Sequence, residues 1–221
     1  MGKVVFSDKC FIIYDKEPGE DSEKLPQDLK SSFEELYVVH RLDKPVSGLI
    51  CLARTKEAAA QISRQITEGV FEKEYRCLAF GHFDEPKGEM RDFLYKDKSS
   101  GKTFIVKRER KGVKEAALLY EVTGEKLDDN GNIISEVKVK LITGRSHQIR
   151  AHLASVGHPL VGDLKYGGKE IRSNHGSWSL GRTTQALHAA RLIIDGKEIT
   201  APLPDAWEEM QQEILGNVII R

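Results

Sequence analysis

The segment that most constrains the fold is residues 128–132, with the sequence DDNGN, which separates two apolar runs at 116–122 and 136–143. An Asn-Gly pair in such a position strongly indicates a β-hairpin, because these residues accept the positive φ of a tight turn. Strands joined by so short a connection pair antiparallel, since a parallel pair needs a crossover of a dozen or more residues. The sequence therefore predicts an antiparallel sheet here.

The remaining elements fit around this hairpin. Short apolar runs predict strands at 4–6, 11–14, 37–39, 48–53 and 74–80, and a second hairpin at 187–194 and 198–200 around Asp195-Gly196-Lys197. Thr55 caps a helix that ends before Gly69, another spans 148–156, and a third spans 206–215. Residues 15–35 are expected as a loop with a short helix, and 82–103 as a charged excursion. Without regular βαβ alternation, the fold class is α+β: a largely antiparallel mixed sheet with a few flanking helices.

Length and composition indicate one ordinary globular domain over residues 1–221. The chain is 39% hydrophobic and 31% charged, which excludes disordered and fibrous classes. Its three cysteines are widely spaced and form no CxxC pair, as expected in a reducing compartment. There is no signal-peptide pattern and no apolar stretch of membrane-spanning length. We expect a cytoplasmic, monomeric protein without a membrane partner.

Positive charge is local, because 34 basic residues balance 34 acidic ones. Residues 95–115 hold eight Lys or Arg against three acids, and residues 138–172 hold seven against two. Such clusters can attract a nucleic acid even when the net charge is zero. A solvated face remains the alternative, and is favoured for the first stretch taken alone.

The segment His40-Arg41-Leu42-Asp43-Lys44-Pro45 lies in a predicted loop at a strand end. Asp43 stands between two cations, which favour its ionised form. A structural capping role for Asp43 is equally compatible with this segment alone. The kinase catalytic loop also begins with His-Arg, but there the Asp follows the Arg directly. This chain also has no Asp-Phe-Gly motif and no glycine-rich phosphate loop, so we do not expect a protein kinase.

A second polar segment, residues 141–153, runs from a predicted strand into a predicted helix. The helix N-terminus favours an anion, and Arg145 and Arg150 add positive charge. His147 and His152 are five residues apart and lack a nearby acid, which does not match the spacing of helical zinc sites. We therefore expect no metal.

Together these segments resemble the RluA family of RNA pseudouridine synthases. The resemblance is carried in order by HRLDxxxSGL at 40–49, KEY at 73–75, GRxHQIRxH at 144–152, GHPLVGDLKYG at 157–167 and LHA at 187–189. It implies a pseudouridine synthase fold, an isomerase acting on ribosomal or transfer RNA, and no cofactor. Two positions differ from the usual family pattern: Glu17 is inserted in Lys16-Glu17-Pro18-Gly19, and Val46 stands where Thr is common. The chain is expected to lack the S4 RNA-binding module of some members.

The same resemblance implies roles for individual residues. Asp43 would be the catalytic carboxylate, Tyr75 would lie against the uracil ring, and Arg150 would pair with Asp43. A half-buried strand Tyr is the plainer interpretation of Tyr75. The resemblance also implies RNA contacts at Arg41, Arg145, His147 and Lys165.

Two other classes of function stay open at this point. A non-catalytic RNA-binding module would explain the basic stretches but gives Asp43 no role. A hydrolytic nucleosidase or glycosidase would need a second acid to activate water, and the matching blocks contain none. Nor does the sequence decide whether Asp43 attacks the sugar, attacks the base or promotes a glycal route.

Overall fold

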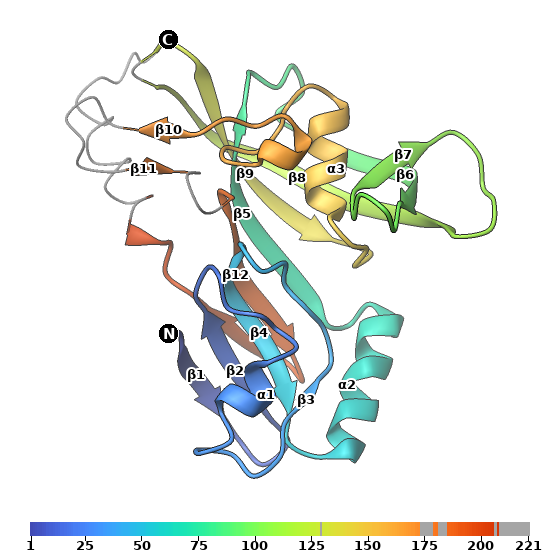
Figure 1. Ribbon diagram of the computed structural model, residues 1–221, viewed down its shortest axis with the longest axis vertical. Coiled ribbons are helices and arrows are strands. Elements are labelled where there is room, and N and C mark those ends of the chain that lie inside the picture. The colour runs from blue at the N-terminus through green and yellow to red at the C-terminus, as the bar shows by residue number, and fades with distance from the viewer. Residues whose placement is uncertain (129, 173–178, 181–184, 206, 208–221) are drawn as a thin grey trace. The chain divides into compact units, whose positions relative to one another are not determined.

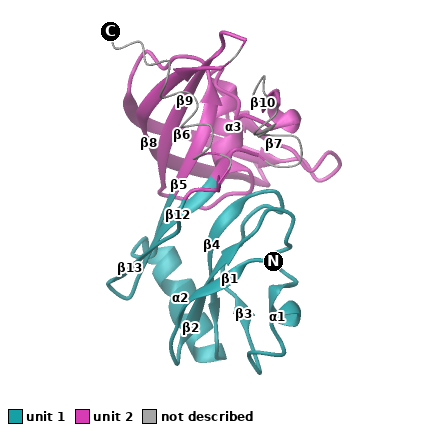
Figure 2. Cartoon of the chain, turned by 90° about the vertical axis from the view of Figure 1, so that its left-hand side faces the viewer, with its two compact units in different colours: residues 1–74, 188–202 teal, residues 75–187, 203–221 magenta. Residues whose placement is uncertain are grey.

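The computed structural model describes residues 1–128, 130–172, 179–180, 185–205 and 207 (Figure 1). The chain divides into two compact units, residues 1–74 with 188–202 and residues 75–187 with 203–221 (Figure 2). The prediction of a single catalytic domain concerns the functional unit and stays a prediction. The predicted helix at 206–215 lies outside the described residues.

The main sheet has eleven strands in the order β1-β2-β4-β12-β5-β9-β8-β6-β7, with β3 beside β4 and β13 beside β12. Most strand pairs are antiparallel, whereas β4 and β12 are parallel. The α+β prediction of a largely antiparallel mixed sheet is therefore confirmed. The described strands of this sheet are β1 (Lys3–Ser7), β2 (Phe11–Lys16), β3 (Tyr37–Val38), β4 (Ser47–Ala53), β5 (Glu72–Phe80), β6 (Lys87–Lys96), β7 (Thr103–Val106), β8 (Val113–Leu127), β9 (Ile133–Leu141), β12 (Leu187–Ile194) and β13 (Lys197–Thr200).

The first unit covers its strands with helix α2 (Lys56–Glu68) and also holds the short helix α1 (Leu25–Asp28). The Thr55 side chain accepts a hydrogen bond from the Ala58 N–H, and Gly69 ends α2 in the left-handed conformation. Ala58 and Ile62 belong to the apolar core that α2 shares with β2, β4 and β12. These contacts confirm the predicted helix. It could be predicted from the sequence because its start, its end and its apolar face each depend on residues that are close together in the chain.

The second unit contains β6 to β9, most of β5, and helix α3 (Gln148–Ser155). Helix α3 packs against β6 and β7 (Figure 1). Beyond it lie a short 3-10 helix, η1 (Leu164–Tyr166), and a small pair of strands, β10 (Ile171–Arg172) and β11 (Ser179–Leu180). The predicted helix at 148–156 is confirmed to within one residue.

The hairpin of β8 and β9 is confirmed and is longer than expected. Its pairing continues to Leu127 and Ile133, across an irregularity between Val122 and Gly124. The Asp128 carboxylate accepts hydrogen bonds from the N–H groups of Asn130 and Asn132, which orders the turn.

The charged excursion predicted at 82–103 is wrong, because strand β6 occupies ten of these residues and pairs with β8. Its sequence, KGEMRDFLYK, places charged side chains on a solvated face, so strict apolar alternation is absent. Arg91 forms a cross-strand ion pair with Glu115 of β8.

None of the described helices has the length and apolar character needed to cross a membrane.

Candidate active site

Asp43 lies in the connection between β3 and β4, at the start of a turn. The carbonyl of Asp43 accepts a 2.9 Å hydrogen bond from the Val46 N–H. The neighbouring Leu42 is buried, and its backbone is held on both sides by Ser22: the Leu42 N–H donates to the Ser22 hydroxyl, which donates to the Leu42 carbonyl. Hydrogen bonds to the backbone thus hold the chain on both sides of Asp43 in one conformation.

Lys16 reinforces this turn from β2. Its side chain is 1% exposed, and its ammonium donates to the carbonyls of Glu17, Glu20 and Lys44. Gly19, at φ 92°, donates its N–H to the same Lys44 carbonyl. Burial lowers the pKa of Lys16 to about 8, although nearby acids, Asp43 among them, oppose the shift. The loop containing the inserted Glu17 is therefore tied to the Asp43 turn within the first unit.

The two residues before Leu42 have opposite environments. Arg41 is exposed and forms an ion pair with Glu23. His40 is partly buried, and its Nε2 accepts a hydrogen bond from the Cys51 N–H at 3.0 Å. Burial holds the pKa of His40 well below its usual value, so the ring is neutral near pH 7. Arg41 is accessible to a ligand, whereas His40 anchors the loop to β4.

The strand that follows Asp43 is fixed by its parallel neighbour. Ser47 and His188 are register partners, and the Ser47 hydroxyl lies 2.8 Å from the His188 Nδ1. Gly48, at φ 102°, faces Ala189 so closely that a Cβ atom would lie 2.4 Å from the Ala189 carbonyl oxygen. The SG of the first block and the HA of the last block therefore meet in one tight strand pair.

In the second unit, Tyr75 lies on β5 and is 6% exposed. The plainer interpretation, a half-buried strand Tyr, understates this burial. Its role against a uracil ring stays a prediction.

The segment before α3 is held by the buried side chain of Gln148. Its amide oxygen accepts from the Arg145 N–H and the Thr143 hydroxyl, and its amide nitrogen donates to the Ala117 carbonyl. The Arg145 Nε in turn donates to the Glu115 carbonyl. These bonds fix the GRSH turn on β8.

Arg150 is buried in α3 beside Asp163. The Arg150 Nε donates to one carboxylate oxygen at 2.7 Å and Nη2 to the other at 2.8 Å. Such a bidentate pair fixes the direction of the guanidinium plane. The predicted pairing of Arg150 with Asp43, a residue of the first unit, stays a prediction.

His147 precedes α3 in a left-handed conformation, with φ 52°. Its Nδ1 lies 3.0 Å from the Tyr166 hydroxyl, which also accepts the Thr103 N–H at 2.7 Å. Because the Tyr166 oxygen accepts from Thr103, its own proton is available for the His147 Nδ1. His147 is thus oriented from η1 and β7, which no local signal indicated.

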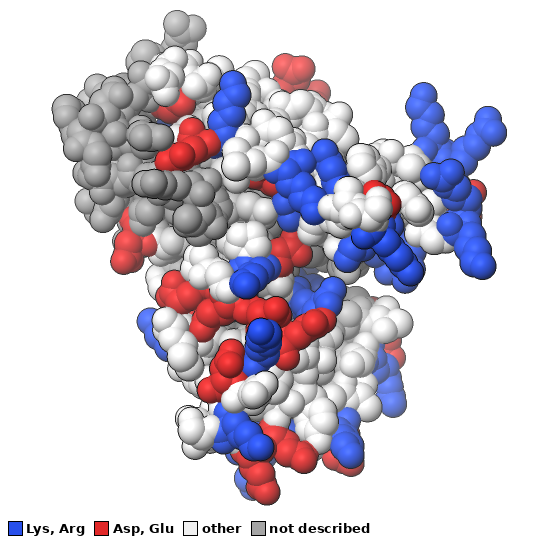
Figure 3. All heavy atoms as spheres, in the orientation of Figure 1, with Lys and Arg blue, Asp and Glu red and all other residues white. Residues whose placement is uncertain are grey.

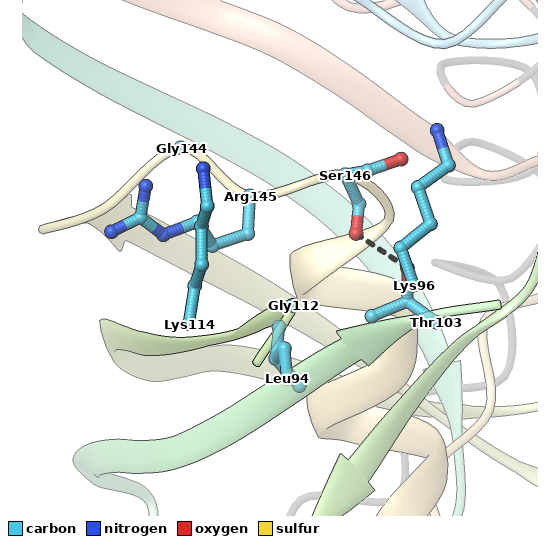
Figure 4. A pocket seen from close by; sticks show the side chains of 8 residues that line it. All are labelled: Leu94, Lys96, Thr103, Gly112, Lys114, Gly144, Arg145 and Ser146. Atoms are coloured by element: carbon cyan, nitrogen blue, oxygen red, sulfur yellow. Dashed lines mark hydrogen bonds between the residues drawn. The ribbon is translucent and has the colours of Figure 1, made fainter. Parts of the chain in front are cut away.

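Basic side chains gather on the part of the second unit that carries β6, β7 and the loop after β7 (Figure 3). Here a pocket of about 300 Å³ is bordered by Lys96, Lys114 and Arg145, and Lys114 and Arg145 extend side by side (Figure 4). Lys165 lies on η1 and donates to the Gly101 carbonyl at 3.0 Å. Both predicted basic stretches therefore contribute to one surface, which suits a polyanion.

Within the ranges that the structure describes, no group of three or more His, Cys, Asp or Glu could hold a metal ion. The second unit brings Arg145, His147 and Arg150 together through one segment, whereas Asp43 and Arg41 belong to the first unit. No role was predicted for Asp163, although this residue lies in the family block at 157–167. Ser22 and the side-chain contacts of Lys16 were also not predicted, because they depend on the tertiary structure.

The family model for RNA pseudouridylate synthase matches residues 10–155 of the chain. This range includes the Asp43 turn, Tyr75 and Arg150. The chain belongs to the RluA-type family of RNA pseudouridine synthases. It is accordingly an isomerase.

Curated relatives of this family resemble the chain over most of its length. The dual-specificity RNA pseudouridine synthase RluA of Yersinia pestis is 30% identical over 209 residues, which cover 90% of this chain and 95% of that protein. The protein of the same name from Vibrio parahaemolyticus is 30% identical over 178 residues, covering 76% and 70%. The solved structure of human RNA pseudouridylate synthase domain containing 1 matches with a TM-score of 0.74 at 24% identity, covering 100% of this chain and 97% of that one. This last likeness concerns the fold alone.

Proposed function

We propose that this isomerase converts a specific uridine of ribosomal or transfer RNA into pseudouridine, with Asp43 as its catalytic carboxylate. The observation that carries the proposal is the family match over residues 10–155, which contains the HRLD block with Asp43 in its expected position. A relative named as a ribosomal large subunit pseudouridine synthase supports the ribosomal class, and relatives named as dual-specificity enzymes support more than one RNA substrate.

The reaction breaks the N1–C1′ bond, turns the uracil and forms a C5–C1′ bond. The proton lost from C5 is balanced by one gained at N1, so the product is an isomer of the substrate. Nothing is oxidised or hydrolysed, and the reaction requires no metal or cofactor. Asp43 would act at the sugar, at the base or through a glycal, and these routes are equally compatible with a carboxylate at this position.

Tyr75 and Arg150 are proposed to act on the same uridine. An aromatic ring can stack on an extruded base, and its burial in β5 would give it a fixed position. A guanidinium that pairs with Asp43 would keep the carboxylate ionised and oriented. Water must be excluded, because water that attacked C1′ after the N1–C1′ bond breaks would complete a hydrolysis and release free uracil.

RNA is proposed to approach over the basic surface of the second unit, with phosphate contacts at Arg145, His147 and Lys165. Arg41 is proposed to fill the space left by the flipped nucleotide or to contact its phosphate, since its side chain is exposed. Phosphate contacts of this kind position an RNA without reading its sequence. We propose that the protein acts as a monomer in the cytoplasm.

The test is Asp43→Asn, which keeps the side chain's size but removes its charge and nucleophilicity. Pseudouridine formation in uridine-containing RNA should fall below detection, while RNA affinity stays within about threefold, because such a residue acts mainly in the transition state. Nucleoside analysis after digestion measures the product. Asp28→Asn, at an exposed acid of the same unit, is the matched control and should leave turnover unchanged.

The same assay separates the alternatives. Free uracil from the wild-type protein would indicate a hydrolase, and unchanged RNA would indicate a binding module. Substantial pseudouridine formation by Asp43→Asn would refute the assignment of Asp43. Equal loss of binding and turnover would make Asp43 a structural cap. Mapping pseudouridines in the host's RNAs with and without the gene would then identify the target uridine.

A further inference from the structure

The buried pair of Arg150 and Asp163 has a specific geometry. Asp163 bonds the edge of the guanidinium formed by Nε and Nη2, and the two side chains are 4% and 0% exposed. The other edge, formed by Nη1 and the second N–H of Nη2, points away from Asp163 because the guanidinium is planar. One edge of the Arg150 guanidinium is therefore bound to Asp163 within the second unit, and these bonds set the direction in which the other edge points.

Asp163 is itself held rigidly. Its carbonyl accepts the N–H groups of Tyr166 and Gly168, and its own N–H donates to the Leu160 carbonyl. At Gly168 a Cβ atom would lie 1.8 Å from that Leu160 oxygen, so the turn requires glycine there. The carboxylate is thus presented to Arg150 from a turn that has little freedom to move.

Tyr166 adds a second support. The Arg150 Cζ lies 4.8 Å from the centre of the Tyr166 ring, a cation–π distance. The Tyr166 hydroxyl is anchored to Thr103 and His147. Asp163 therefore fixes an edge of the guanidinium, and Tyr166 lies against it.

We propose that Asp163 is the positioning residue for Arg150, acting on the reaction through Arg150 and touching no substrate. This inference rests on the proposed role of Arg150 in the isomerase. A buried guanidinium without a counter-ion is strongly unfavourable. Asp163 balances the charge of Arg150, so that Arg150 meets a second anion through N–H donors already held in one direction. Such preorganisation matters because a displacement of about 1 Å in an active site can cost about 100-fold in rate.

The experiment is a double-mutant cycle of Asp163→Asn and Arg150→Met, assayed by pseudouridine formation over a range of RNA concentrations that extends to saturation. Asp163→Asn should lower kcat by about 10- to 100-fold and leave KM within about threefold. In the double variant, kcat should equal that of Arg150→Met within about threefold, because Asp163 has no other route to the reaction. Multiplicative losses in the double variant would overturn the proposal, as would a wild-type kcat in Asp163→Asn.

The matched control is Glu136→Gln, which breaks a different ion pair of the second unit, a partly buried one with Arg76 on β5. It should lower the melting temperature but leave kcat unchanged. An equal loss of kcat in Glu136→Gln would overturn the proposal, since the effect would then follow from weakened structure in general.

Asp163→Asn leaves a buried guanidinium without its charge partner, so folding is checked by circular dichroism. If that variant does not fold, Asp163→Glu keeps the charge and displaces the carboxylate by one methylene; it should show the same loss of kcat at constant KM. A wild-type kcat in a folded Asp163→Glu would overturn the proposal. Failure of the proposed function is recognised separately, because the wild-type protein would then form no pseudouridine.

Discussion

Replacing Gly48 by Ala tests the tight pairing of β4 and β12. Gly48 combines φ 102° with a register position opposite Ala189. A Cβ atom there would lie 2.4 Å from the Ala189 oxygen and 2.7 Å from its nitrogen, closer than real Cβ contacts occur. The substitution must therefore separate the two strands, and the Ser47–His188 hydrogen bond beside them would lengthen.

Two costs add to the magnitude. An unfavourable backbone conformation at a residue other than glycine costs about 1–3 kcal/mol. Overpacking against a rigid backbone costs about 1–3 kcal/mol. We expect the free energy of unfolding to fall by about 4 kcal/mol, a large part of the stability of an ordinary domain.

Urea unfolding followed by circular dichroism measures this loss, and amide hydrogen exchange in β4 and β12 locates it in the first unit. The matched control is Gly124→Ala in β8, where a Cβ atom would meet only the Glu136 carboxylate at 3.9 Å. That change should be neutral or stabilise by up to about 1 kcal/mol, because glycine is unfavourable in a strand. If Gly48→Ala cost no more than about 1 kcal/mol, the steric account of this strand pair would be refuted.

Three further predictions concern pH, charge and metal. Burial lowers the pKa of His188 to about 4, so between pH 6.5 and 4 the unfolded chain binds a proton more readily than the folded protein. As the pH falls from 6.5 to 4, the free energy of unfolding of the wild-type protein should therefore decrease relative to that of His188→Gln, as measured by urea unfolding. Reversing Lys107 and Arg108 to Glu should weaken RNA binding and reduce the slope of log K against log salt by about 1–2, whereas reversing Lys9 and Lys56 in the first unit should not; an unchanged slope would remove the loop after β7 from the interface. Chelator treatment should leave turnover unchanged, and a loss restored by a transition metal would contradict this.

The elements predicted correctly are those with local signals. Thr55 and Gly69 bound α2 because capping depends on a few neighbouring residues. The Asn-Gly turn likewise joins β8 and β9 as expected. Strand β6 escaped prediction because its outer face is solvated and charged, so its pattern resembles a loop.

The candidate site was predictable only in part. The family blocks locate Asp43, Tyr75 and Arg150 in the sequence, but no spacing rule joins Arg150 to Asp163 or Lys16 to the Lys44 carbonyl. These contacts depend on how separate loops pack, and a buried Lys16 is contrary to what its residue type predicts. Local chemistry thus located the motifs, and only the tertiary structure revealed what holds them in place.

The parallel pair of β4 and β12 has a consequence for synthesis on the ribosome. Its two hydrogen-bonded residues, Ser47 and His188, are 141 positions apart. At about 5–20 residues per second, roughly 7–30 s separate the appearance of these strands. During that interval the inner face of β4, including Leu49 and Cys51, lacks the Leu192 and Ile194 side chains that complete its core. The first part of this unit is synthesised early, and its last strands follow only after the intervening 113 residues, 75–187. During that time the nascent chain exposes an apolar strand edge, which we expect a chaperone to cover.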